Sequence, residues 1–417
     1  MTARNRTLYL LSFAELLAMG LWFSASAVSP ALSLEWDLSD SSKAWLTMSV
    51  QIGFVVGTFF SAFFNLSDIL NARHLFVVSA LLGALFNGAI GLFAQGIDSV
   101  LTLRFCTGVC LAGVYPPGMK IMATWFREGR GMAIGMLVGA LTLGSASPHL
   151  LKVAGSPDWR DLMFTASLAS VLAAVICLAF VKDGPYQTSG ARFDWRAVGR
   201  AVADRGVRLA NFGYLGHQWE LYAVWTWVPV FLFYSFRDSG VADAAGGSAL
   251  AAFAVIGVGG IGCVAAGVLA DRYGRTTITI ISLVVSGACC LLVGFLYGGS
   301  PLLLLAFCLL WGLVIVADSA QFSASITELA EPAYLGTVLT MQTCVGFLLT
   351  MGSIRLIPVF ADWIGWPWVF APLAVGPVLG ALSMYRLRQL PEAARILGGT
   401  QKMSIEKRKS HGSTPPV

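Results

Sequence analysis

The chain has 417 residues, of which 57% are hydrophobic and only 12% are charged, and its mean hydropathy is +0.74. Soluble domains carry about a quarter charged residues, and a soluble core of this length could not hide so much apolar surface. The composition therefore excludes a soluble enzyme or binding module and indicates an integral membrane protein.

Twelve apolar stretches, each long enough to cross a bilayer as a helix of roughly 20 residues, follow one another along the chain. They lie at residues 8–30, 44–66, 75–95, 99–122, 132–152, 162–181, 209–234, 248–270, 277–297, 301–325, 336–360 and 366–385. We therefore expect an all-α membrane protein with a bundle at 1–182, a cytoplasmic linker at 183–208, a second bundle at 209–385 and a cytoplasmic polar tail at 386–417. No folded catalytic domain fits outside the spans, so function must lie inside the bundles.

The distribution of Lys and Arg predicts the orientation, because these residues favour the cytoplasmic side of a membrane. With the first residue inside, twenty of the 27 fall in cytoplasmic segments, which also accounts for the net charge of +5. We therefore expect both termini in the cytoplasm and a multi-pass protein of the cell membrane. The basic run Lys407–Lys409 fits a solvated tail beside the lipid surface, so we expect a lipid bilayer and no nucleic acid as a partner.

All eight cysteines lie in apolar stretches, which argues against a secreted disulfide framework. Cys106 and Cys110 share a helix face, but a metal site would need further ligands that the sequence does not place nearby. We expect no metal and no cofactor.

The two halves of the chain repeat at an offset near 205 residues. Such duplication is typical of carriers whose binding site lies between two repeats. The aligned pairs are Asp68 with Asp271, Glu15 with Glu220, and Trp159 with Trp366.

The segment Gly267–Arg275, which reads Gly-Val-Leu-Ala-Asp-Arg-Tyr-Gly-Arg, resembles the signature loop of the major facilitator superfamily. The fourth stretch is similar to the family as well, with Arg104, Gly108 and Pro116. The resemblance covers essentially the whole chain, and it implies twelve helices in two pseudo-symmetric six-helix bundles that alternate between two conformations.

The resemblance implies that the signature loop and its first-half copy hold one of these conformations. The first-half copy keeps two charged residues but has Phe64 and Asn71 where the family has glycines. A charged turn that only fixes topology remains the alternative. The implied gating residues are Asp68, Arg73, Gly267, Asp271, Arg272, Gly274 and Arg275.

Within the superfamily, the run Gly216–Tyr222 looks closest to nitrate/nitrite-type and cyanate-permease-like members. The paired arginines that nitrate porters use in the second and eighth helices have no match in this chain. The resemblance therefore points to a small organic anion or metabolite and not to nitrate itself.

Ionisable side chains inside membrane spans are costly, so each one is a functional candidate. A buried carboxylate can take up a proton when the cavity opens in one direction and release it in the other, and a histidine can relay that proton. The candidates for proton coupling are Glu220, Glu15, His217 and Asp318.

Substrate binding would require cations for an anionic group, together with aromatic and amide side chains. A rise of 1.5 Å per residue places Glu15 and Arg104 about 10 Å apart in depth, with Trp22 nearer Arg104. Core packing remains an alternative for each aromatic residue, and Lys120 and His149 near span ends are interpreted as snorkelling residues. The candidates for substrate binding are Arg104, Arg355, Trp22, Trp225, Trp227 and Gln321.

These patterns favour a monomeric, proton-coupled secondary transporter of a small, anionic organic solute that works by alternating access. A proton-driven exporter of drugs or metabolites is the first alternative, and a non-transporting sensor or assembly protein on the same scaffold is the second. An enzyme is not expected, because no span carries a nucleophile and base or a metal-ligand set at helical spacing.

Overall fold

The computed structural model describes residues 2–64, 66–126, 129–153, 158–186, 199, 202–331 and 335–396. Most of the predicted linker and the tail from residue 397, with its basic run Lys407–Lys409, lie outside the described residues. Within the described ranges, seven side chains are also left out of the description: Pro30, Asp40, Ser67, Asp68, Arg130, Lys152 and Val153.

The first half of the described chain is a succession of helices. They are α1 (Ala3–Ala27), α2 (Ser29–Trp36), α3 (Asp40–Phe63), α4 (Leu66–Ile69), α5 (Ala72–Phe93), α6 (Ile97–Leu111), α7 (Tyr115–Trp125), α8 (Arg130–Val153) and α9 (Trp159–Phe180).

The second half is helical in the same way. Its α-helices are α11 (Arg205–Asp238), α12 (Ala244–Gly257), α13 (Gly259–Tyr273), α14 (Arg275–Leu292), α15 (Pro301–Ile315), α16 (Ser319–Leu329), α17 (Leu335–Ile364) and α18 (Val375–Gln389). Short 3-10 helices are η1 (Val293–Leu296), η3 (Trp366–Trp368), η4 (Ala371–Ala374) and η5 (Pro391–Arg395).

Eleven segments of the described chain are long and apolar enough to cross a membrane, and they match eleven of the twelve predicted stretches. The remaining stretch, 209–234, lies in α11. This helix has 34 residues, more than the roughly 20 that a bilayer needs. Its polar residues His217, Gln218 and Glu220 lower its apolar character, which is why length and composition alone do not single it out.

Three of the predicted spans are each made of two consecutive α-helices, and the span at 366–385 begins with the two short helices η3 and η4 before α18. The span at 99–122 divides into α6 and α7 just before Pro116, where the missing backbone N–H and the proline ring disturb the preceding turn. The span at 248–270 divides at Val258, which lies between two glycines, and the span at 301–325 divides at residues 316–318. The last of these breaks leaves Asp318 immediately before α16.

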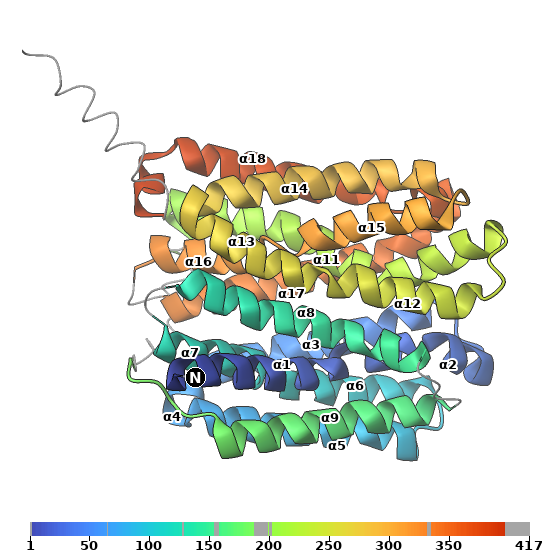
Figure 1. The fold of residues 1–417 in the computed structure, drawn as a ribbon, viewed down its shortest axis with the longest axis horizontal. Helices are drawn as coiled ribbons and strands as arrows, with labels where there is room; N and C mark the ends of the chain where they lie inside the picture. Colours follow the sequence, from blue (N-terminus) through green and yellow to red (C-terminus); the bar gives the residue numbers. More distant parts are fainter. Residues whose placement is uncertain are drawn as a thin grey trace, which may run out of the picture.

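The helices form two bundles that lie side by side, α1–α9 in one and α11–α18 in the other (Figure 1). Within the first bundle α3 packs on α6, α5 on α9, and α1 on both α8 and α9; within the second, α11 packs on α17 and α18. The bundles meet where α8 contacts α12 and α13 and where α3 contacts α17. The predicted two-bundle fold is therefore confirmed.

Most of the helices lie along the longest axis of the molecule, which therefore has two ends (Figure 1). The N-terminus, α4, α7 and α16 lie at one end, which we call the N-terminal end. Helix α2 and the connection from α11 to α12 lie at the other, which we call the α2 end.

Small residues allow α8 and α13 to approach closely. A methyl group added at Gly135 would lie 2.7 Å from the carbonyl oxygen of Cys263, and one at Gly139 would lie 2.7 Å from that of Gly260. Only glycine permits such contact between helix backbones in a membrane protein. The glycines at residues 257–262 therefore serve the packing of α13 against its neighbouring helices.

Candidate transport pathway

Six aromatic side chains meet where the two bundles face each other. The ring centroid of Trp22 lies 5.0 Å from that of Phe54 and 5.5 Å from that of Phe347, and the ring centroids of Tyr222 and Phe347 are 5.0 Å apart. Each of the six is at most 7% exposed. Any passage between the bundles must therefore open this group, which we call the central aromatic cluster: Trp22, Phe23, Phe54, Tyr222, Trp225 and Phe347.

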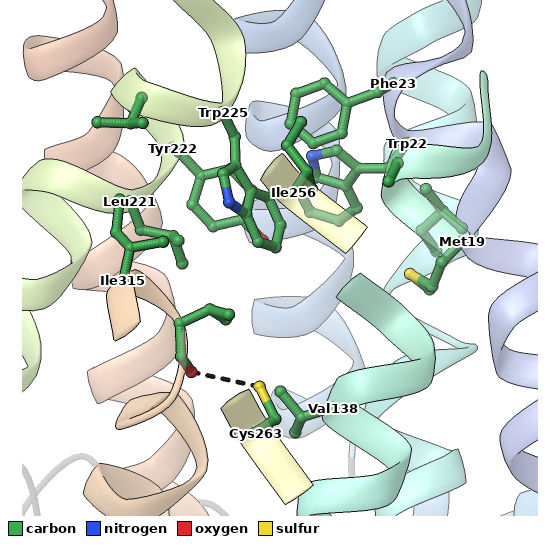
Figure 2. Packing of buried hydrophobic residues seen from close by; sticks show 14 of the residues in the cluster. Met19, Trp22, Phe23, Val138, Leu221, Tyr222, Trp225, Ile256, Cys263 and Ile315 are labelled. Atoms are coloured by element: carbon green, nitrogen blue, oxygen red, sulfur yellow. Dashed lines mark hydrogen bonds between the residues drawn. The ribbon is translucent and has the colours of Figure 1, made fainter. Parts of the chain in front are cut away.

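Figure 2 shows how the two halves contribute to the central aromatic cluster, with Trp22 and Phe23 of α1 opposite Tyr222 and Trp225 of α11. The centroids of Trp22 and Tyr222 are 5.8 Å apart, and those of Phe23 and Trp225 are 6.2 Å apart. Ring pairs at such distances each contribute about 0.5–1.5 kcal/mol beyond the burial of their area. The cluster thus joins the bundles at their centre.

A cavity of about 290 Å³ lies between the cluster and the α2 end of the molecule. We call it the α2-end cavity. Its wall is built by both bundles, from α1, α2, α3 and α8 on one side and α11 and α12 on the other. Phe23 and Trp225 belong both to its lining and to the central aromatic cluster, and Lys43 and His149 contribute its basic side chains.

At the N-terminal end the bundles are in close contact through α8 and α13. A methyl group added at Gly267 would lie 2.7 Å from the carbonyl oxygen of Gly131, and one at Gly131 would lie 2.5 Å from a carboxylate oxygen of Asp271. Asp271 thus lies at the first turn of α8, where a negative charge is favoured by the helix dipole. The signature loop is therefore engaged with the opposite bundle.

Arg275, the last residue of the signature loop, is held inside the second bundle. Its Nη2 lies 2.8 Å from Oε1 of Glu328, and its Nη1 donates to Oε1 of Gln321 at 2.8 Å. Gln321, expected to bind substrate, contacts the loop in this structure. Arg272 is exposed and lies over the ring of Tyr273, while Gly274 adopts a φ of +91°, which favours glycine.

The first-half copy of the loop contacts its own bundle. Arg73 donates from Nη1 to the carbonyl oxygen of Val181 at 3.2 Å, and Asn71 donates to Asp183 at 2.6 Å. The side chain of Asp68 lies outside the described residues. This half therefore ties the start of α5 to the end of α9.

Arg104 is completely buried, and its guanidinium binds backbone carbonyl groups. Nη1 donates to the carbonyl oxygen of Leu21 at 2.6 Å, Nε to that of Leu46 at 3.2 Å, and Nη2 to that of Trp22. In this conformation the side chain joins α6 to α1 and α3.

Glu15 and Glu220, the pair aligned by the repeat, are both buried, and each faces the fourth membrane segment of its own half. A methyl group at Gly118 of α7 would lie 2.9 Å from a carboxylate oxygen of Glu15. Glu220 Oε1 accepts from Trp311 at 2.8 Å, as well as from Ser286 at 2.5 Å and Cys290 at 3.2 Å. Glu15 accepts no hydrogen bond from the described residues, so the symmetric positions have different surroundings.

His217 and Asp318 form a buried acid–base pair. Nδ1 of His217 in α11 lies 3.0 Å from Oδ1 of Asp318 at the break before α16, and the two side chains are 2% and 1% exposed. Neither carboxylate oxygen of Asp318 accepts a hydrogen bond from the described residues, so the contact with His217 is one of distance and charge. Two of the four predicted proton-coupling residues are therefore in contact with each other.

Trp227 and Arg355 lie outside the central aromatic cluster, although Trp227 lines the α2-end cavity. Trp227 donates from its indole to the carbonyl oxygen of Ile354 at 3.0 Å, which ties α11 to α17. Arg355 is exposed and donates to Ser41 at the start of α3 at 2.5 Å, so it joins the bundles near the α2 end. Of the six candidates, Trp22 and Trp225 share the central aromatic cluster, and Trp225 and Trp227 share the lining of the α2-end cavity.

A model of the Major Facilitator Superfamily matches residues 11–350. The chain belongs to the major facilitator superfamily. It is accordingly a membrane transporter and not an enzyme, and the fold and family expected from the signature loop are confirmed.

Relatives within the superfamily are distant. The chain is 24% identical to the MFS-type transporter pytF of Aspergillus terreus over 57% of this chain and 78% of the relative. It is 25% identical to a probable 4-methylmuconolactone transporter of Cupriavidus pinatubonensis, covering 79% and 76% of the two chains. It is 23% identical to the hexuronate transporter of Escherichia coli K12, covering 89% and 91%.

A solved structure supports the same fold. A point mutant of the nucleoside transporter NupG superposes with a TM-score of 0.69 at 14% sequence identity, covering 93% of this chain and all of the other. At this identity the likeness concerns the fold alone.

Two polar residues, Asn87 and His149, have contacts or a position that the sequence did not predict. Asn87 of α5 donates to Ser167 and to the carbonyl oxygen of Met163, each at 3.0 Å, and accepts from Ser24 at 2.6 Å. A single Asn in an otherwise apolar stretch could have indicated it, because membrane helices use such amides to join their neighbours. His149, interpreted as a snorkelling residue, lines the α2-end cavity.

Proposed function

We propose that the chain is a secondary active carrier that moves a small organic anion together with protons by alternating access. The relatives whose names state a solute, hexuronate and 4-methylmuconolactone, handle small organic acids or their derivatives. The α2-end cavity supports this class of solute, because it has two basic side chains and lies directly beside the interface between the bundles.

The observation that carries the proposal is the contact between His217 and Asp318. Ionisable side chains inside a membrane protein are rare and usually paired with one another, and such pairs commonly serve transport. The pair lies at the break between α15 and α16, where a helix can change direction. Gain or loss of one proton changes the net charge of the pair, so protonation and helix geometry are coupled at this position.

The conformation of the described residues fits one of the two states that we propose for alternating access. The α2-end cavity is present, the central aromatic cluster is packed, and α8 and α13 are in contact at the N-terminal end. We assign the α2 end to the outside and both termini to the cytoplasm, in line with the distribution of Lys and Arg. The carrier then functions as a monomer in the cell membrane, with its bundles at 1–182 and 209–385.

The test is solute uptake into liposomes that contain the purified protein, with and without an imposed pH gradient. Radiolabelled glucuronate, benzoate and inorganic anions are the solutes. The variants are Asp318→Asn and Glu220→Gln, and the matched control is Asp161→Asn, because Asp161 is exposed on α9.

We expect the gradient to stimulate uptake by the wild type and the control. Asp318→Asn should lose the gradient-driven component and keep exchange of solute against solute. Uptake that ignores both the gradient and the substitution would refute proton coupling. Broad uptake of uncharged, apolar compounds against the gradient would instead favour the exporter, and no flux of any solute would favour the sensor.

A further inference from the structure

The α2-end cavity is small and has a definite chemical polarity. Its volume of about 290 Å³ lies at the lower limit of ligand pockets, which range over roughly 300–1,000 Å³. A cavity of this size suits a ligand with one ring and one short substituent.

The charge of the lining has one sign. Lys43, in the first turn of α3, and His149, on α8, both line the cavity, and no Asp or Glu is among the described side chains that line it. Both basic residues belong to the first bundle. A ligand that carries one negative charge therefore finds its complement on that side of the cavity.

The opposite wall is aromatic and belongs to the second bundle. Trp225, Trp227, Phe233 and Tyr234 all project from α11 into the lining, and Phe23 completes it from α1. Flat aromatic faces stack with planar groups in offset or edge-to-face arrangements. This wall favours a planar, apolar ligand body over a sugar ring with hydroxyl groups on both faces.

Two polar atoms in this wall lack a partner. The indole N–H of Trp225, a side chain that is only 2% exposed, and the hydroxyl of Thr226 make no hydrogen bond with the described residues. Buried donors are normally satisfied, so an unpartnered donor on a residue that lines a cavity is available to an acceptor on a ligand. A carboxylate or a ring substituent that contains oxygen provides that acceptor.

We propose that the α2-end cavity binds a small aromatic monocarboxylate, with its carboxylate toward Lys43 and His149 and its ring against Trp225 and Phe233. The proposal rests on the transport function proposed above and names its substrate class. The two bundles then supply different parts of the site, the charge from α3 and α8 and the stacking surface from α11. Separation of the bundles at this end would divide the site and release the ligand.

The experiment measures binding separately from transport. Isothermal titration calorimetry of the purified full chain at pH 7 compares three probes: benzoate, its neutral isostere benzamide, and the non-aromatic cyclohexanecarboxylate. The variants are Lys43→Gln for the charge and Phe233→Leu for the aromatic wall. Lys182→Gln is the control for loss of a positive charge, because Lys182 is exposed at the opposite end. Thermal unfolding confirms that each variant is folded.

We expect the wild type and the control to bind benzoate about tenfold to a hundredfold more tightly than benzamide, as charge-assisted contacts do. Lys43→Gln should remove that preference, and Phe233→Leu should remove the preference for benzoate over cyclohexanecarboxylate. Equal affinity of the wild type for benzoate and benzamide, or no binding of benzoate, would overturn the proposal.

Uptake assays on the same preparations separate this inference from the proposed function. Gradient-driven flux of glucuronate without any binding of benzoate would overturn the aromatic site and leave the carrier intact. Binding of benzoate with the expected discrimination, but flux that ignores the pH gradient, would leave the site standing and refute proton coupling.

Discussion

Gly267 of α13 lies so close to Gly131 of α8 that an added methyl group would be 2.7 Å from the Gly131 carbonyl oxygen. The two residues belong to different bundles, and the contact is between backbones, which cannot move aside as a side chain can. The glycine of the signature loop is therefore needed for the contact at the N-terminal end, and Asp271, one helical turn further on, lies at the start of α8.

Substitution of Gly267 by alanine should weaken the contact between α8 and α13. Overpacking of this kind costs about 1–3 kcal/mol, which shifts a two-state equilibrium about fivefold to 150-fold. Distances between spin labels at Arg6→Cys and Glu331→Cys, both exposed at the N-terminal end, should lengthen. Gly352→Ala is the control, because no atom lies within 4 Å of a methyl group there. An unchanged distance distribution in Gly267→Ala would contradict the role assigned to this glycine.

Arg104→Lys should destabilise the first bundle although the charge is kept. A guanidinium reaches the carbonyl oxygens of Leu21, Trp22 and Leu46 at once, and a single ammonium group cannot match that geometry. Each hydrogen bond to a charged group contributes about 1.5–3 kcal/mol. We expect a clear fall in the apparent Tm of the purified protein, whereas Arg272→Lys, at an exposed position, should leave it unchanged. Equal Tm values for the two variants would show that the hydrogen bonds of Arg104 do not stabilise the first bundle.

The positions of the helices were largely predictable from sequence, because a bilayer demands long apolar runs and this chain has little else. The breaks were not. Asp318 was interpreted as a charge within one span at 301–325, but it lies at a helix break, and an apolar run carries no signal for a turn that is stabilised by neighbouring helices. Pro116 did provide such a signal for the break between α6 and α7.

The site was predictable in composition and less so in geometry. Depth along a helix follows from counting residues, and the expected nearness of Arg104 to Trp22 agrees with the structure. The direction of a side chain around the helix axis does not follow from counting. Glu220 consequently lies among α14 and α15 inside the second bundle, and Gln321 contacts Arg275, although both helices were expected to line a passage.

Asn87→Leu should destabilise the first bundle. The amide of Asn87 is fully buried and joins α5 to α1 and α9 through Ser24, Ser167 and the carbonyl oxygen of Met163. Leucine has a similar size but makes none of these hydrogen bonds, and Ser24, Ser167 and the Met163 carbonyl each keep one other bond. We therefore expect a cost of about 0.5–1.5 kcal/mol for each hydrogen bond lost. Thermal unfolding in detergent measures the effect. A variant as stable as the wild type would indicate that the network is dispensable.

Glu220→Ala and Glu220→Gln should differ sharply in stability. The three donors Ser286, Cys290 and Trp311 all reach Oε1 of Glu220, and the amide oxygen of glutamine can accept from the same donors. Alanine removes the shared acceptor of all three donors, of which Trp311 keeps a second one in Ser286, and it also creates a cavity, so we expect it to cost about 2–5 kcal/mol.

The readouts for Glu220 are the apparent Tm and uptake with and without a pH gradient. If Glu220 carries the proton, Glu220→Gln keeps the wild-type Tm and loses gradient-driven uptake, because the amide of glutamine does not gain or lose a charge near neutral pH. If Glu220 only packs the second bundle, the same variant keeps both properties. Equal Tm values for the alanine and glutamine variants would contradict the hydrogen-bonding role that the contacts with α14 and α15 assign to this carboxylate.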